Sequence, residues 1–187
     1  MPLTMQGLGN NKASFRVYIE NIPPLERYQN LQITRPMEQG EIKMIADETG
    51  NHWRKIFNVY AKLLFDINPR TFSTWQQLRD NYLLQNSGHE ALLFSPPEFN
   101  EAPSPILHII MGKSYANKLG LADSAFWLND CFAINKQKRI IICPYFDYRQ
   151  LSNARITQLV GLIHSLTGSH PIALRHTDDV SGGKAFI

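Results

Sequence analysis

The polar side chains best suited to chemistry follow one short apolar run near residue 140. The chain reads RIIICPYFDYRQLSNARI from Arg139, and its polar part begins after Pro144. Ligands of open α/β sheets bind beyond the carboxyl ends of the strands, so a polar stretch that follows a buried strand is a candidate binding loop. Its candidate ligand-binding residues are Tyr145, Asp147, Arg149, Ser152 and Asn153.

These residue types suit an anionic or aromatic ligand, and they also suit a purely structural loop. The rings of Tyr145, Phe146 and Tyr148 could stack on a nucleobase. The guanidinium groups of Arg149 and Arg155 could bind a phosphate or a carboxylate. A helix that starts at Ser152 would favour an anion at its N-terminus. In the structural alternative, Asp147 and Arg149 pair at the surface, Ser152 only caps the helix and the aromatic rings close the core. The residue types leave both interpretations open.

Two further loops add polar residues to the same candidate site. Glu20 and Asn21 belong to the segment ENIPP, which follows the first strand pattern, and SPPEFNE at 95–101 follows the apolar run ALLF. Because the carboxyl ends of parallel strands share one edge of a sheet, we expect the three loops to converge in one cleft. Glu20 and Asn21 complete the predicted set of ligand-binding residues.

The elements that must position these loops can be read from the periodicity of apolar residues. Strands are predicted at 15–19, 91–94, 106–110 and 139–143, with CFAI as a hairpin arm before the last. Helices are predicted over 38–66 with a break near Thr49 to Asn51, after Pro69 with Thr71 or Ser73 as cap, over KSYANKLG, and after Ser152 or Asn153. This alternation predicts an α/β three-layer sandwich, with a mainly parallel central sheet of about four strands and helices on both faces.

Other motifs are incomplete. MGKS, at 111–114, matches the end of a phosphate-binding P-loop, but Leu107 stands where the motif needs a glycine, so Lys113 is predicted to be a solvated helix residue. The six histidines lack metal-ligand spacing, and His108 within an apolar run is predicted to be a hydrogen-bonded core imidazole. His176, Asp178 and Asp179 could touch a metal, but a mobile tail is the favoured interpretation. We predict no metal and no cofactor.

The whole-chain properties indicate an ordinary globular protein. The 187 residues are predicted to form a single α/β domain over 1–187, with loose tails at 1–12 and 176–187. A net charge of +3 is weak evidence for a polyanionic partner. Cys131 and Cys143 lack C-x-x-C spacing and are predicted to be unpaired thiols. Since no signal peptide or membrane-spanning run is found, we expect a cytoplasmic protein without a membrane partner, and its oligomeric state stays open.

One family shares the succession of motifs in the C-terminal half. ILHIIMGKSYANKLG, a hairpin-like insertion and RIIICPYFDYRQLSNARI resemble the C-terminal half of the uracil-DNA glycosylase superfamily, over roughly 105–170. In that family a strand ends in a glycine followed by a short helix with an A-x-K-like pattern, matched here by Gly112, Ala116 and Lys118. A later strand delivers a histidine-proline-serine loop to the DNA minor groove.

The catalytic motifs of that family are degenerate or absent here. No histidine lies between Pro144 and Ser152, where the family's stabiliser of the departing uracil anion would fall, and ENIPP lacks the glycine of the family's first-strand loop. The resemblance therefore implies a fold more than an activity.

We predict a bacterial-type α/β binding protein with a loop site for a nucleobase, nucleotide or nucleic acid, without demonstrable catalysis. One alternative is a divergent DNA glycosylase, a base-excision hydrolase that uses Asn21 or Glu20 with Arg149 or Asn153. A second alternative is a protein–protein interaction or regulatory domain whose polar loop binds another chain.

Overall fold

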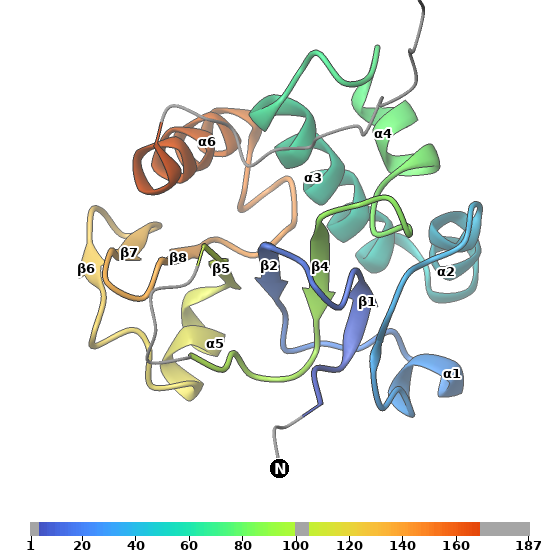
Figure 1. Cartoon of the computed structure of the whole chain (residues 1–187), viewed down its shortest axis with the longest axis horizontal. Helices are drawn as coiled ribbons and strands as arrows, with labels where there is room; N and C mark the ends of the chain where they lie inside the picture. Colours follow the sequence, from blue (N-terminus) through green and yellow to red (C-terminus); the bar gives the residue numbers. More distant parts are fainter. Residues whose placement is uncertain (1–3, 100–104, 169–187) are drawn as a thin grey trace, which may run out of the picture.

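A mixed sheet of eight strands forms the centre of the molecule (Figure 1). The computed structural model of the chain describes residues 4–99 and 105–168. The strands are β1 Gly7–Gly9, β2 Phe15–Tyr18, β3 Thr34–Arg35, β4 Glu90–Leu93, β5 Leu107–Met111, β6 Phe126–Trp127, β7 Ala133–Asn135 and β8 Ile140–Cys143. Their order across the sheet is β3-β1-β4-β2-β5-β8-β7-β6.

The four predicted strands 15–19, 91–94, 106–110 and 139–143 correspond to β2, β4, β5 and β8, the parallel centre of this sheet. β2 pairs in parallel with β4 and β5, and β5 pairs in parallel with β8. Around this centre, β1 and β7 pair antiparallel with β4 and β8. The α/β class and the mostly parallel arrangement are confirmed, whereas the prediction of about four strands was too low. The missed strands β1, β3 and β6 have two or three residues each, too few to produce a periodic pattern.

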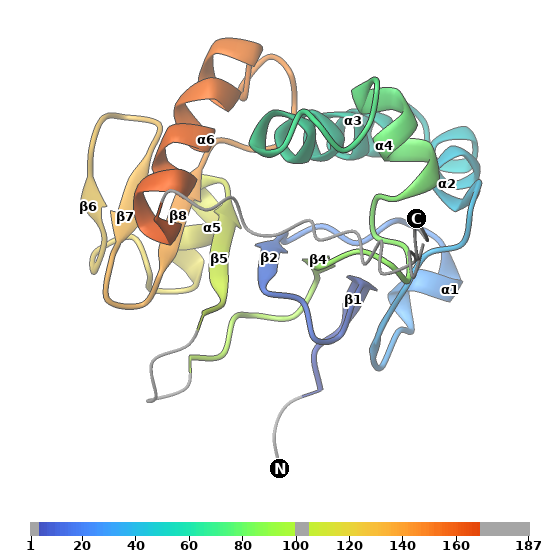
Figure 2. The same cartoon turned by 45° about the horizontal axis from the view of Figure 1, so that its top comes forward.

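Helices lie on both faces of the sheet, as predicted, but very unequally. They are α1 Glu26–Gln29, α2 Glu41–Thr49, α3 Asn51–Ile67, α4 Trp75–Asn81, α5 Lys113–Lys118 and α6 Asn153–Thr167. α2, α3, α4 and α6 lie together over one face (Figure 2), and their apolar side chains share a core cluster with Ile109 and Ile141. The next residues along those strands, Ile110 and Ile142, point to the other face, where the short α5 packs.

The central helix α3 is separated from α2 by Gly50 alone. Gly50 has φ +90° and ψ −163°, a conformation that residues with a side chain rarely adopt, so the helix must break there. This confirms the predicted break near residues 49–51. α3 then buries nine of its 17 residues, among them Ile56 and Tyr60, which makes it the main helical support of the sheet.

Several local predictions need correction. Thr74 caps α4 by accepting the Gln77 N–H, so neither Thr71 nor Ser73 is the cap. The short α1, which follows ENIPP, was not predicted, and its Tyr28 is buried in the main core. The predicted loose arm 1–12 contributes Gly7–Gly9 to the sheet, while 176–187, with His176, Asp178 and Asp179, lies outside the described residues.

The other local predictions that the structure addresses are confirmed. CFAI and RIIIC form the β7–β8 hairpin, whose turn holds Arg139 at φ +54°. Lys113 is exposed in the first turn of α5. The His108 side chain is buried with its Nδ1 2.8 Å from the Tyr18 hydroxyl, and burial lowers its pKa to about 4. Cys131 and Cys143 are free thiols.

Candidate functional site

The carboxyl ends of β2, β5 and β8 bring together loops that are far apart in the sequence. Tyr18 in β2 pairs with Ile110 in β5, and Met111 in β5 pairs with Cys143 in β8, so the segments after these strands leave the same edge. Those segments contain Asn21 after β2, Gly112 after β5 and Tyr145 after β8. This edge is where sequence reasoning placed the candidate site.

Tyr145 connects two other elements at this edge. Its hydroxyl donates to Asn21 Oδ1 at 3.1 Å and lies 2.9 Å from His52 Nε2 in the first turn of α3. The rings of Tyr145 and His52 are stacked, with centroids 5.7 Å apart and 14° between the planes. Since the hydroxyl has one proton and donates it to Asn21, His52 Nε2 must be the donor in the other bond. Burial, with the charges of Asp147 and Glu20, raises the pKa of Tyr145 to about 12, so this hydroxyl stays neutral.

Gly112 and an ion pair complete the described surroundings of Tyr145. A Cβ on Gly112 would lie 3.9 Å from the Tyr145 ring, an ordinary contact, but the backbone φ of +96° favours glycine. Glu20, the residue before Asn21, forms an ion pair with Lys118 of α5, and both side chains are largely exposed. The edge therefore presents an amide, an imidazole, a phenol and one exposed ion pair.

Asp147 and Arg149 do not form the surface ion pair that the structural interpretation of the loop suggested. Asp147 pairs with Lys55 of α3 at 3.3 Å, and its Oδ1 accepts the backbone N–H of Arg149 at 2.9 Å. That backbone bond is the main cause that lowers the pKa of Asp147, and Lys55 adds to it. The Arg149 guanidinium lies over the Tyr148 ring, 5.7 Å from its centroid. The suggested surface ion pair between Asp147 and Arg149 is thus replaced by the pair with Lys55.

Ser152 and Asn153 have structural positions at the start of α6. Ser152 is the N-cap and its Oγ accepts the Arg155 N–H at 3.4 Å, which resolves the two alternatives for the cap. Asn153 is the first helical residue and is exposed. Within residues 4–99 and 105–168, no hydrogen bond joins either side chain to Asn21, His52 or Tyr145.

The loop after β4 takes another direction. Ser95 Oγ accepts the backbone N–H of Gln6, next to β1, at 3.1 Å, and the Phe94 ring lies edge-on to Trp53. Residues 100 and 101 of the predicted loop lie outside the described part of the chain. Two of the three expected loops, those after β2 and β8, are therefore joined by a described hydrogen bond, and the third is tied to β1.

Sequence reasoning missed His52, Lys55 and Lys118, which all contact predicted site residues. His52 and Tyr145 are 93 positions apart, and no motif connects them. The available signal was the TGN break, because it places His52 at the first turn of a helix whose far end is buried against the same sheet.

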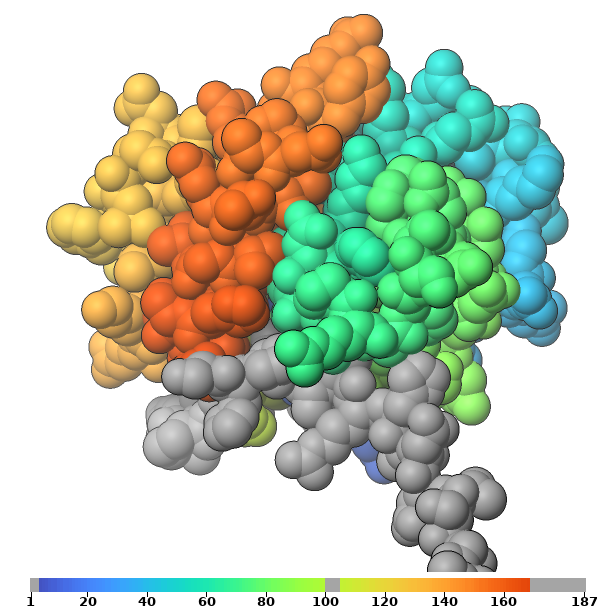
Figure 3. Space-filling model, turned by 90° about the horizontal axis from the view of Figure 1, so that it is seen from above, coloured from blue at the N-terminus to red at the C-terminus, as the bar shows by residue number. Residues whose placement is uncertain are grey.

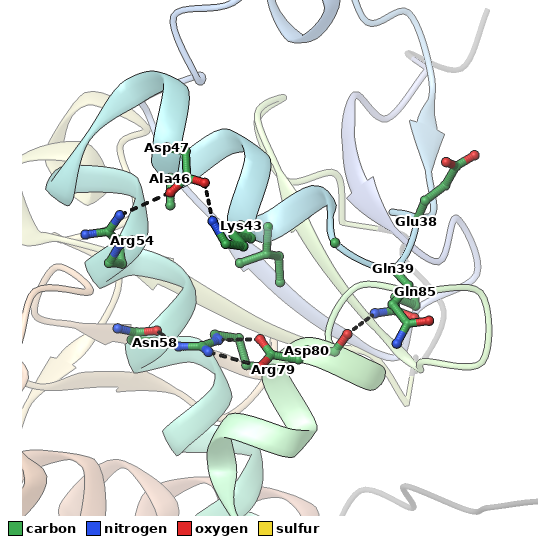
Figure 4. Close-up of a pocket in the computed structure, with 12 residues that line it drawn as sticks. Glu38, Gln39, Lys43, Ala46, Asp47, Arg54, Asn58, Arg79, Asp80 and Gln85 are labelled. Carbon is green, nitrogen blue, oxygen red and sulfur yellow. Dashed lines mark hydrogen bonds and ion pairs between the residues drawn. The ribbon is translucent and has the colours of Figure 1, made fainter.

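A cavity lies elsewhere, between α2, α3 and α4 (Figure 4). It measures about 450 Å³, and most of its charged side chains pair with one another. Asp47 accepts from both Lys43 and Arg54, while Arg79 bonds to Asp80 and Asn58. The described residues contain no group of three or more potential metal ligands. Of the six charged side chains that line this cavity, Glu38 alone has no described side-chain partner. Because the cavity also lies away from the carboxyl ends of β2, β5 and β8, the strand edge remains the stronger candidate.

Fold and edge together define an α/β protein with a mostly parallel sheet and a polar cluster at the carboxyl ends of its central strands. The chain belongs to a family of unknown function, DUF6942, whose model matches residues 6–164. No curated protein and no solved structure matches the chain. Within the described residues, no helix is both long enough and apolar enough to cross a bilayer.

Proposed function

We propose that this chain is a binding protein whose site at the carboxyl edge of β2, β5 and β8 takes a nucleobase or a nucleotide. The observation that carries the proposal is the contact of Tyr145 with both Asn21 and His52. The stacked Tyr145 and His52 rings offer an aromatic platform, and the Asn21 amide offers both a donor and an acceptor to the polar edge of a base. Lys55 supplies a cation one helical turn from His52.

The direct test measures the binding of uridine and uridine monophosphate by titration calorimetry. Tyr145→Ala removes the stacking ring and the hydroxyl, so we expect a loss of roughly 1–3 kcal/mol of binding free energy. Tyr145→Phe keeps the ring and should lose about 1 kcal/mol, the value of one hydrogen bond. His89→Gln is the matched control for His52→Gln, because His89 precedes β4 at the opposite edge of the sheet. Equal affinities for wild type and all Tyr145 and His52 variants would rule out this site.

A second candidate function is base excision, and His52 is the observation that favours it. The resemblance to uracil-DNA glycosylases implies a polar first-strand residue and an imidazole that stabilises the departing base anion. Asn21 occupies the first position, and His52, from a different element, supplies an imidazole at the same edge. The succession of β5, Gly112, α5, the hairpin, β8 and α6 also agrees with that resemblance.

Release of free uracil from a uracil-containing oligonucleotide separates the two candidates. Excision predicts base release that falls at least about tenfold in His52→Ala, because alanine has no N–H to donate to a departing anion. Binding without any base release supports the first proposal alone. If neither nucleotide binding nor base release occurs, the polar loop is better explained as a surface for another protein chain.

A further inference from the structure

A basic stripe runs along the outer face of α3, starting beside His52. Asn51, Lys55, Asn58 and Lys62 recur at helical spacing, so they occupy one face of the helix. Together with Arg54, Val59 and Tyr148 they line a surface pocket of about 330 Å³. The pocket has three cationic residues and no acidic residue in its lining, unlike the cavity between α2, α3 and α4. We define these residues and Trp75 as the α3 stripe.

An aromatic ring with two cations on it marks each end of the stripe. The Tyr148 ring holds Lys55 Nζ at 4.9 Å and the Arg149 guanidinium at 5.7 Å. The Trp75 ring holds Lys62 Nζ at 5.1 Å and the Arg79 guanidinium at 5.4 Å. Tyr148 is 52% exposed, more than any other tyrosine among the described residues.

The distance between the two ends suits a short length of nucleic acid strand. Lys55 and Lys62 are two helical turns apart, which is about 10 Å along the axis. A stacked strand advances about 3.4 Å per nucleotide, so this distance corresponds to about three nucleotides. Proteins that bind single strands combine cations for the phosphates with aromatic rings for the bases, and the stripe offers both.

The stripe also continues directly into the edge site. Lys55 pairs with Asp147, which lies two residues after Tyr145, and His52 is one turn before Lys55 on the same helix. In the space-filling view, α3 and α4 lie beside α6 at the surface of the molecule (Figure 3). A strand lying on α3 could therefore place one terminal or flipped base at Tyr145 and His52.

We propose that the α3 stripe binds the backbone and bases of a single-stranded nucleic acid, and leads one base into the edge site. The proposal rests on the proposed nucleotide function for its last step only. A bound phosphate must compete with Asp147 for Lys55, since the two are already 3.3 Å apart. A variant that removes this competition should therefore bind nucleic acid more tightly, whereas a variant with a damaged fold would bind it more weakly.

The experiment measures binding of fluorescent dT and rU oligonucleotides of 1, 3, 5 and 10 nucleotides across a salt series. We expect affinity to rise steeply from one to about three nucleotides and then to level off. Lys55→Gln and Lys62→Gln should each reduce the salt slope by about 0.7, the value for one phosphate contact of a single strand. Tyr148→Ala should weaken binding by about 5-fold to 100-fold, the range for one lost base stack. Asp147→Asn should tighten binding, because it releases Lys55.

Lys136→Gln is the matched control, because this exposed lysine lies in the β7–β8 turn at the opposite edge of the sheet. It removes the same charge and should leave affinity and salt slope unchanged. A comparison of dT with rU separates DNA from RNA as the source of the strand. Circular dichroism confirms that each variant is folded.

Three outcomes would overturn the stripe: no gain in affinity with length, equal salt slopes for the α3 and Lys136 variants, or competition by poly-glutamate as strong as by an oligonucleotide of equal charge. Loss of monomer binding in Tyr145→Ala alongside any of these outcomes leaves the edge site intact and rejects the stripe alone. Length-dependent binding that Tyr145→Ala does not change supports the stripe and rejects the edge site.

Discussion

Glu90 is a carboxyl group inside the core, at the first position of the central strand β4. Its side chain is 1% exposed, and its Oε1 accepts the backbone N–H of Leu84 at 2.7 Å. Oε2 has no hydrogen-bond partner among the described residues. Burial raises the pKa of Glu90 from 4.5 to about 7, since no described cation is paired with it to favour the charged form. A carboxyl group here should hold its proton until near neutral pH.

This raised pKa predicts a loss of stability as the pH rises from acidic to neutral values. Between pH 4.5 and 7 the folded state keeps a proton that the unfolded state has released, so the contribution of Glu90 is full below 4.5 and is lost as pH rises through 7. From pH 5 to pH 8, the loss should be roughly 2–3 kcal/mol in the free energy of unfolding. Urea unfolding of wild type and Glu90→Gln at both pH values measures it, because glutamine cannot ionise.

The comparison with Glu90→Gln also removes the effect of His108, whose titration changes the stability with pH in the opposite direction. Burial lowers the pKa of His108 to about 4, so His108 costs stability as pH falls below its unfolded value of 6.5. Both proteins contain His108, and its effect cancels in their difference. If that difference is the same at pH 5 and pH 8, Glu90 does not titrate in this range.

At the scale of elements, the start of α6 separates a capping residue from its neighbour. Ser152 accepts a hydrogen bond from the first turn, whereas Asn153 is exposed at the first helical position. Ser152→Ala should therefore lower the free energy of unfolding by about 1 kcal/mol, and Asn153→Ala should change it by less than about 0.5 kcal/mol. Chemical denaturation of both variants tests this. A larger loss of unfolding free energy for Asn153→Ala than for Ser152→Ala would show that Asn153, not Ser152, caps the helix.

A substitution at the junction between α2 and α3 tests the backbone conformation alone, because an added methyl group would contact no other atom there. Nothing lies within 4 Å of a Cβ built on Gly50 or on Gly161, but only Gly50 has a positive φ. Gly50→Ala should cost roughly 1–3 kcal/mol because alanine is strained at φ +90° and ψ −163°. Gly161→Ala, inside α6, should instead stabilise the protein by about 0.5–1 kcal/mol.

If the backbone conformation of each glycine alone determines the effect, the melting temperature should fall for Gly50→Ala and rise for Gly161→Ala. The Gly50 variant has a functional consequence too, because Gly50 sets the direction of the α3 turn that carries His52. A destabilised Gly50→Ala protein should also bind uridine monophosphate less well at temperatures where it is fully folded. Stabilisation by both substitutions would contradict the strained geometry at Gly50.

At the scale of the whole molecule, the sequence predicted the strands whose residues are buried along their whole length, and it did not predict the short outer strands. The runs around Leu92, Ile109 and Ile141 are apolar on both faces because helices or loops cover both sides, and the run around Val17 alternates with Arg16, so the strand character of all four was visible. The outer strands lack this signal. Thr34–Arg35 and Phe126–Trp127 are strands only because a neighbouring strand supplies their hydrogen bonds.

The candidate site follows the same division. The rule that loops meet at the carboxyl edge of a parallel sheet was enough to place Asn21 near Tyr145. The TGN break places His52 at the start of a helix, but it does not assign His52 or Lys55 to this edge, since both residues reach it through the packing of α3 against α6 and the sheet. Sequence periodicity defines which side of α3 is apolar, but not which loop the polar side will contact.

The two cysteines provide a probe of how the whole sheet opens. Cys143 is fully buried at the end of β8, between β5 and β7, and burial raises the pKa of its thiol strongly, so it should react only when the sheet opens. Cys131 is half-buried in the hairpin and should react in the native state. In a Cys131→Ser variant, labelling of Cys143 across a urea series should follow the same midpoint as circular dichroism, because a central strand opens with the global transition. Rapid labelling of Cys143 without urea would show that the β7–β8 hairpin detaches from β5 on its own.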